Sequence, residues 1–110
     1  MSVDESLKIA FTGDFCPLGA AEEAVMSEPA ADLLGGASEL FEEADIVVGN
    51  LETPLTDRGK DIRKTGPNFR ADPALAPRIR ELGFDVLTLA NNHIADFGAT
   101  GIADTMEALD

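Results

Sequence analysis

Three short apolar segments, each followed by polar residues, constrain the fold of this chain most strongly. They span residues 7–12, 46–49 and 86–90. Runs of this length and character suit buried strands that stop at polar turns. Strands separated by helices are joined by right-handed crossovers, which produce a parallel sheet. The pattern therefore predicts an α/β fold in which helices flank a mainly parallel sheet.

Helical stretches fill the intervals between the predicted strands. The predicted helices cover residues 20–26, residues 39–44, a segment ending at residue 82, and a segment from about residue 100. Ser38 is suited to cap the second helix, and Asp72 and Pro73 are suited to start the third. Pro77 lacks a backbone N–H, so the regular part of that helix is expected to begin later. Gly83 is expected to end it.

Polar side chains follow each predicted strand. Asp14 follows the first strand, Asn50 and Glu52 follow the second, and Asn92 and His93 follow the third. The carboxyl ends of parallel strands share one edge, where α/β proteins place their sites. Each residue alone is more typical of a turn than of a ligand. Three coincidences at one edge indicate a functional site.

Three motifs carry a family resemblance. They are Phe-Thr-Gly-Asp at residues 11–14, Gly-Asn-Leu-Glu-Thr-Pro at residues 49–54, and Ala-Asn-Asn-His-Ile-Ala-Asp-Phe-Gly at residues 90–98. Together they resemble the CapA family of poly-γ-glutamate capsule-synthesis proteins, which is similar to calcineurin-like metallophosphatases. The resemblance implies the N-terminal half of a metallophosphatase-like layered α/β sandwich, with residues 1–110 forming a partial domain.

The resemblance also implies roles for the residues at the predicted edge. Asp14 stands where the first metal carboxylate belongs, and Asn50 or Glu52 where a carboxylate would bridge two metals. Asn92 matches the amide ligand, and His93 matches the neighbouring general acid.

Two neighbouring features qualify this assignment. Asp96 lies close enough in sequence to orient the His93 imidazole, although a histidine that only hydrogen-bonds within a turn is the alternative. Phe15 and Cys16 follow the first motif where the phosphatases have a nearby histidine. Because that histidine is missing, the motif does not decide whether the site would hold one metal or two.

The implied chemistry is metal-assisted hydrolysis, in which a bound ion acidifies water and neutralises charge on the group attacked. His93 would protonate the leaving oxygen, a task suited to a side chain that titrates near neutrality. Oxygen-rich ligands with few histidines favour Mg²⁺ or Mn²⁺ over Zn²⁺.

The end of the chain predicts either a truncated chain or the product of a split gene. His93 is the sole histidine, whereas phosphatase-like centres take further histidines from the second half of the fold. Glu107 and Asp110 also crowd the negative end of the last helix, which is unfavourable for a natural ending. A half-domain is expected to leave one sheet face uncovered, and therefore to self-associate or to be poorly stable. The fragment alone is expected to be inactive.

The charge balance excludes whole classes of partner. Asp and Glu number 21 against 8 Lys and Arg, giving a formal charge of -13. Such a chain repels nucleic acids and anionic membranes. Only three cations are lysines, so adaptation to concentrated salt is one interpretation and an ordinary acidic protein is the other. Residues 1–6 lack a basic targeting region and no membrane segment follows, so a cytoplasmic location is predicted.

Five of the eight cations are concentrated in the predicted loop before residue 72. They are Arg58, Lys60, Arg63, Lys64 and Arg70. Arg63 and Lys64 are the candidate substrate-binding residues, and the expected partner is an anionic small molecule or a polyglutamate chain. A solvated loop with compensating charge is the alternative.

Together with these observations, the resemblance implies a metal-dependent hydrolase of capsule or poly-γ-glutamate biosynthesis, phosphoesterase-like if it is active. The alternative is a non-catalytic accessory protein that keeps the fold as a scaffold for polymer synthesis. A simple anion-binding α/β domain ranks last, because the chain has no phosphate-binding glycine motif.

Overall fold

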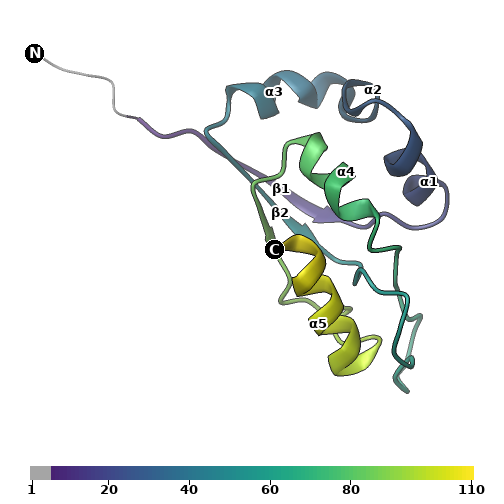
Figure 1. Ribbon diagram of the computed structural model, residues 1–110. Coiled ribbons are helices and arrows are strands. Elements are labelled where there is room, and N and C mark those ends of the chain that lie inside the picture. The colour runs from purple at the N-terminus through teal and green to yellow at the C-terminus, as the bar shows by residue number, and fades with distance from the viewer. Residues whose placement is uncertain (1–5) are drawn as a thin grey trace, which may run out of the picture.

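A three-stranded parallel sheet in the order β1-β2-β3 lies at the centre of the molecule (Figure 1). The computed structural model describes residues 6–110, so the prediction about a targeting region falls mostly on residues outside this range. The strands are β1 (Ile9–Phe15), β2 (Ile46–Leu51) and β3 (Val86–Thr88). The predicted parallel α/β architecture is confirmed.

Helices connect the strands on one side of the sheet. α1 (Ala20–Ser27), α2 (Ala30–Leu34), a 3₁₀ turn at Gly35–Ala37 and α3 (Ser38–Glu43) join β1 to β2. α4 (Leu75–Leu82) joins β2 to β3, and α5 (Gly98–Leu109) follows β3. Two successive right-handed crossovers in one direction place both connections on the same face. Figure 1 shows α1 to α3 arching over α4 on that face. Within residues 6–110 no helix has the length and apolar character that crossing a membrane requires.

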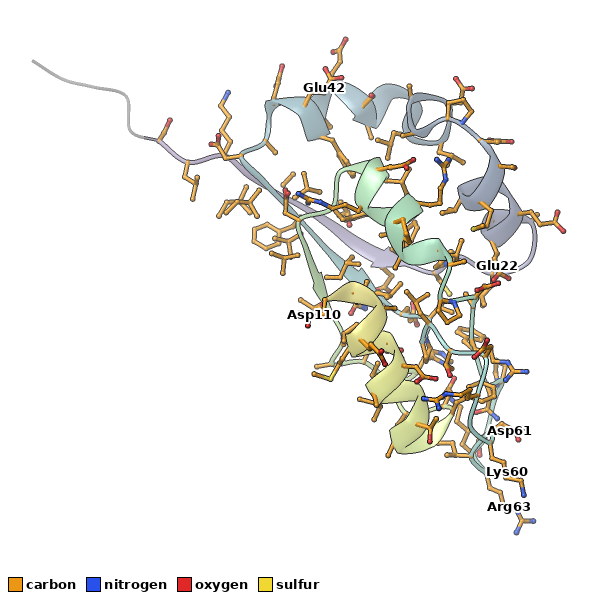
Figure 2. The ribbon with its side chains drawn as sticks, in the orientation of Figure 1. Glu22, Glu42, Lys60, Asp61, Arg63 and Asp110 are labelled. Carbon is orange, nitrogen blue, oxygen red and sulfur yellow. The ribbon has the colours of Figure 1, made fainter. Side chains whose placement is uncertain are left out.

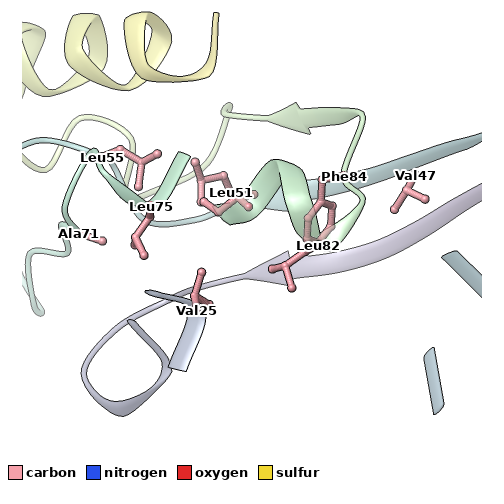
Figure 3. Close-up of a cluster of buried hydrophobic side chains, with 9 residues drawn as sticks. Val25, Val47, Leu51, Leu55, Ala71, Leu75, Leu82 and Phe84 are labelled. Atoms are coloured by element: carbon pink, nitrogen blue, oxygen red, sulfur yellow. The ribbon is translucent and has the colours of Figure 1, made fainter. Parts of the chain in front are cut away.

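The core lies between the sheet and α4 (Figure 3). Leu75, Ile79 and Leu82 recur at helical spacing and form the buried face of α4. Val47 and Leu51 point toward them from β2, and each is 1% exposed. This single cluster holds the covered face of the sheet against the helices.

The opposite face of the sheet carries exposed apolar side chains. Phe11, Val48 and Val86 are register partners across the three strands, so their side chains share one face. Phe11 is 76% exposed and Val86 is 48% exposed. Parallel sheets are normally covered on both faces. Among residues 6–110, the expected uncovered face is therefore present.

β1 differs from its prediction at Gly13 and Asp14, where a turn was expected. The strand continues to Phe15, and its register with β2 shifts by one residue between Phe11 and Asp14. Gly13 has a φ of 84°, a left-handed conformation that glycine adopts without steric penalty. The extra residue brings Asp14 opposite Asn50. The turn was wrong because a glycine bulge has the same local signal as a strand end.

β2 extends beyond its predicted end at residue 49, through Asn50 to Leu51. Asn50 therefore lies in the strand instead of after it. β3 ends at Thr88, two residues before its predicted end, so Leu89 and Ala90 lie between the strand and the following turn.

The predicted cap at Ser38 is wrong. The 3₁₀ turn at Gly35–Ala37 runs directly into α3, so Ser38 has helical backbone angles and makes no capping hydrogen bond. α2 was not predicted, because its five residues are too few for a clear hydrophobic period.

α4 begins later than its turn signals, as Pro77 led us to expect. The Asp72 carboxylate accepts a hydrogen bond from Ala74 N at 2.9 Å, and the regular helix starts at Leu75. Pro77 then falls in the first turn, where a missing N–H removes no helical hydrogen bond. Gly83 ends the helix in the left-handed conformation, which confirms the predicted C-terminal cap.

Candidate functional site

Side-chain hydrogen bonds tie the carboxyl ends of the three strands together. Asn50 Nδ2 on β2 donates to Asp14 Oδ1 on β1 at 2.9 Å. Asn50 Oδ1 accepts from Thr88 Oγ1 on β3 at 3.0 Å and from Asn91 Nδ2 at 3.1 Å. Residues far apart in sequence thus meet at one edge, where the site was predicted.

Asn91 connects this network to the histidine. Its Nδ2 also donates to Leu51 O at 2.9 Å, and its Oδ1 accepts from His93 N at 3.0 Å. Asn92 was the predicted amide ligand, and Asn91 had no predicted role. Asn92 is exposed, and no hydrogen bond of its side chain is found among residues 6–110. The pair of adjacent asparagines could have indicated that one of them supports the turn. The structure shows that this one is Asn91, and that Asn92 faces solvent.

Each ring nitrogen of His93 lies near a carboxylate. Its Nδ1 lies 2.6 Å from Asp96 Oδ2, and its Nε2 lies 3.8 Å from Glu52 Oε1. A carboxylate only accepts, so Nδ1 carries the proton in this pair. Phe69 stacks on the imidazole with ring centroids 3.8 Å apart and planes 13° apart. The side chain is 8% exposed, so the ring is almost completely buried.

Asp96 is the buried anchor of this cluster. Its carboxylate is 0% exposed and accepts from Lys64 Nζ at 2.5 Å and from Phe69 N at 2.7 Å, in addition to His93. Its backbone oxygen accepts from Ile62 N at 2.9 Å. Burial alone would raise the pKa of Asp96, but the hydrogen bonds from Lys64, His93 and Phe69 N outweigh it, and the pKa lies below its usual value. Asp96 is therefore an ionised carboxylate.

The segment after β2 is fixed to α5 by buried polar groups. Thr105 Oγ1 accepts from Leu55 N at 2.9 Å and is completely buried. Asp104 accepts from Thr56 Oγ1 at 2.6 Å and pairs with Arg58 at 2.5 Å. These contacts lower the pKa of Asp104 below its usual value, with the Arg58 hydrogen bond as the main cause. They hold the loop that leads from Glu52 to the cluster at Asp96.

The five cations of the loop divide into two groups. Arg58 pairs with Asp104, Lys64 pairs with Asp96, and the Arg70 guanidinium lies 4.7 Å from the centroid of the Phe97 ring. Lys60 and Arg63 are exposed, and Figure 2 shows them at the loop tip, pointing away from the body. The two candidate substrate residues are thus separated. Lys64 lies within the site, and Arg63 faces solvent.

Oxygen donors dominate the possible metal ligands. Asp14 and Glu52 are carboxylates at neighbouring strand ends, and Asn92 adds an amide, a set of the kind that holds Mg²⁺ or Mn²⁺. The Asn50 carbonyl oxygen already accepts two hydrogen bonds, and its amide nitrogen faces Asp14. Among residues 6–110, no three His, Cys, Asp or Glu side chains form a metal-binding group. Because Asn50 is engaged by its neighbours, Glu52 is the better candidate ligand of the two.

The fold and these side chains define a parallel α/β domain whose polar site lies at the carboxyl edge of its sheet. The family model described as "Bacterial capsule synthesis protein PGA_cap" matches residues 8–110. The chain belongs to this family, which confirms the resemblance seen in its motifs.

Curated relatives agree with this placement. The chain is 32% identical over 109 residues to the capsule biosynthesis protein CapA of Bacillus anthracis, covering 96% of this chain and 26% of that protein. It is 30% identical over 106 residues to the PGA biosynthesis protein CapA of Bacillus subtilis, covering 94% and 27%. A probable polyglutamine synthesis accessory protein of Mycobacterium tuberculosis is 40% identical over 65 residues, covering 59% and 17%. The chain thus spans about a quarter of the length of the two CapA proteins.

Proposed function

We propose that this chain supplies part of a metal-dependent hydrolase site that acts in the biosynthesis of a capsule or of poly-γ-glutamate. The observation that carries the proposal is the hydrogen-bonded convergence of Asp14, Asn50 and His93 at the carboxyl edge of the sheet. Membership of the capsule synthesis family and the names of the relatives support the biological setting.

Asp14, Glu52 and Asn92 would hold a divalent cation. When bound, such an ion supplies an acidified water and neutralises charge on the group attacked. Asn50 positions the Asp14 carboxylate by donating to Oδ1, so Oδ2 would be the oxygen available to a cation. Asn91 supports the turn that presents Asn92 and His93.

His93 is the proton donor of the proposed site. The Asp96 carboxylate holds the Nδ1 proton, so in the imidazolium form Nε2 would give its proton to a leaving oxygen and leave the neutral ring with Nδ1 still protonated. Glu52 lies beside that nitrogen at 3.8 Å, and Phe69 covers one face of the ring. The imidazole is therefore aimed and shielded from water on one side, as a general acid requires.

The uncovered sheet face is continuous with the proposed site. Val48 and Asn50 lie two residues apart on β2, so their side chains share the face that also carries Phe11 and Val86. Any layer that covers this face lies beside Asp14. We propose that such a layer supplies the remaining ligands.

Lys60 and Arg63 at the loop tip fit an anionic substrate. They add positive charge at an exposed point of a strongly acidic chain, where they can attract a phosphoester or a polyglutamate chain.

A non-catalytic accessory role is the second candidate. The relative from Mycobacterium tuberculosis is named as an accessory protein, and Phe15 and Cys16 follow Asp14 where a ligand histidine stands in the phosphatases. In this role, the same edge would bind the polymer without hydrolysing it.

Metal titration of the complete gene product, followed by assays on phosphoesters and poly-γ-glutamate, separates the two functions. Turnover that needs Mg²⁺ or Mn²⁺ and is lost in Asp14→Asn and in His93→Gln supports the hydrolase. Asp32→Asn is the matched control, since Asp32 is an exposed carboxylate on α2, away from this edge. Polymer binding without turnover on any substrate would instead support the accessory role.

A further inference from the structure

The loop between β2 and α4 reaches back to the histidine. Lys64 Nζ contacts Asp96 Oδ1 at 2.5 Å, and His93 Nδ1 contacts Asp96 Oδ2 at 2.6 Å. Each oxygen of one buried carboxylate therefore holds one of the two side chains. Lys64 Nζ also lies 3.3 Å from His93 Nδ1. Because both are donors, this contact is not a hydrogen bond, and both groups are directed at Asp96.

Phe69, five residues after Lys64 in the same loop, also contacts this imidazole. Its ring stacks on His93 at 3.8 Å between centroids, and its backbone N–H donates to Asp96 Oδ2 at 2.7 Å. The ring thus limits the tilt of the imidazole, while the backbone limits rotation of the carboxylate.

We propose that Lys64 and Phe69 are positioning residues for His93. Lys64 holds Asp96 in the orientation that accepts the Nδ1 proton, and Phe69 sets the plane of the ring, so that Nε2 is presented toward Glu52. The role of Nε2 in hydrolysis rests on the proposed function, whereas the positioning of the His93 ring by Lys64 and Phe69 is independent of that function.

The geometry separates Lys64 from its neighbour Arg63. The Lys64 side chain is 19% exposed and its ammonium is bound to Asp96, whereas Arg63 points to solvent from the loop tip (Figure 2). Loss of the Lys64 charge should therefore disturb His93, and loss of the Arg63 charge should not. A longer cation at position 64 can still reach the carboxylate, so Lys64→Arg should rescue the effect.

Proton and nitrogen NMR of the single histidine tests this directly at about pH 8, where an ordinary histidine is neutral. The parent chain should show one Nδ1–H resonance at low field, protected from exchange with water. Lys64→Met should lose this resonance, while Lys64→Arg and the control Arg63→Met should keep it. An unchanged resonance in Lys64→Met would overturn the role of Lys64.

The stacking on Phe69 has its own readout. The carbon-bound ring protons of His93 should be shifted upfield by the Phe69 ring current, and Phe69→Leu should remove that shift. Ring protons at the same positions in the parent chain and in Phe69→Leu would overturn the role of Phe69.

A measurement on the unmodified chain covers the case in which Lys64→Met does not fold. The sequence has three lysines, Lys8, Lys60 and Lys64. Only the Lys64 ammonium should give a slowly exchanging proton–nitrogen signal, because the other two are exposed. Three equally fast ammonium groups would overturn the proposal. Since none of these readouts needs turnover, a missing hydrolase activity would leave the positioning intact, and an active enzyme with a normal His93 in Lys64→Met would refute only the positioning.

Discussion

Asn50 Nδ2 donates a hydrogen bond of 2.9 Å to Asp14 Oδ1 across the β1–β2 pair. This contact depends on the bulge at Gly13, because an uninterrupted register would set Gly13 opposite Asn50. One irregular residue thus aligns the first carboxylate of the site with the centre of its hydrogen-bond network.

Gly49→Ala should destabilise the fold. A Cβ at this position would lie 2.6 Å from Phe84 Cε1 and 2.9 Å from Thr12 Oγ1, so the buried ring would have to move. We expect a loss of roughly 1–3 kcal/mol in the free energy of unfolding, measured by urea denaturation. Gly36→Ala is the control, because nothing lies within 4 Å of its added Cβ. Equal stability of the two variants would contradict this packing.

Acid should weaken the fold through Asp96. Its pKa in the folded chain lies below the ordinary value, so its contribution to stability is present above about pH 4 and is lost as the pH falls through the folded pKa. Asp96→Asn should lower stability at neutral pH by roughly 3 kcal/mol, because Lys64 loses its buried partner. It should also lose less stability on acidification than the parent does.

Denaturation curves between neutral pH and about pH 2 measure both effects. Asp32→Asn, at an exposed position of α2, is the control and should follow the parent. If Asp96→Asn matched the parent at neutral pH, Asp96 would not be the anchor described.

The uncovered sheet face should cause self-association of the isolated chain. Phe11→Ser removes its most exposed large side chain and should shift sedimentation equilibrium toward monomer. Leu40→Ser is the matched control, because Leu40 is 63% exposed but lies on α3, away from this face. If the parent chain were monomeric at all concentrations tested, the uncovered sheet face would not cause self-association.

Salt should stabilise the chain. With 21 acidic and 8 basic side chains, self-repulsion opposes the compact state until it is screened. The melting temperature should rise from low to molar KCl, and should rise more than in a sucrose solution of equal osmolality. A melting temperature that does not change with KCl would remove the hypothesis of salt adaptation.

Much of the architecture could be predicted, because apolar segments and helix-ending residues are visible in the sequence. The three apolar runs predicted the parallel sheet, and Gly83 predicted the end of α4. The errors came from signals that are ambiguous over short distances. Gly13 forms a bulge instead of a turn, and Ser38 continues a 3₁₀ turn instead of capping α3.

The location of the candidate site could be predicted from the sequence, but most of its side-chain contacts could not. Parallel topology brings Asp14, Asn50 and His93 to one edge, and this convergence was expected. The role of Asn91 and the path of Lys64 to Asp96 depend on how a turn and a long loop fold back. Neither has a local pattern, so sequence alone could not distinguish Asn91 from Asn92 or Lys64 from Arg63.

Paramagnetic broadening by Mn²⁺ in the nitrogen–proton NMR spectrum tests the central claim most directly, because it detects weak binding by a partial ligand set. The account predicts that the backbone signals of Asp14, Glu52 and Asn92 broaden first, and that Asp14→Asn abolishes the preference. Broadening spread over the acidic surface, with no preference for these three residues, would contradict a metal site at the carboxyl edge of the sheet.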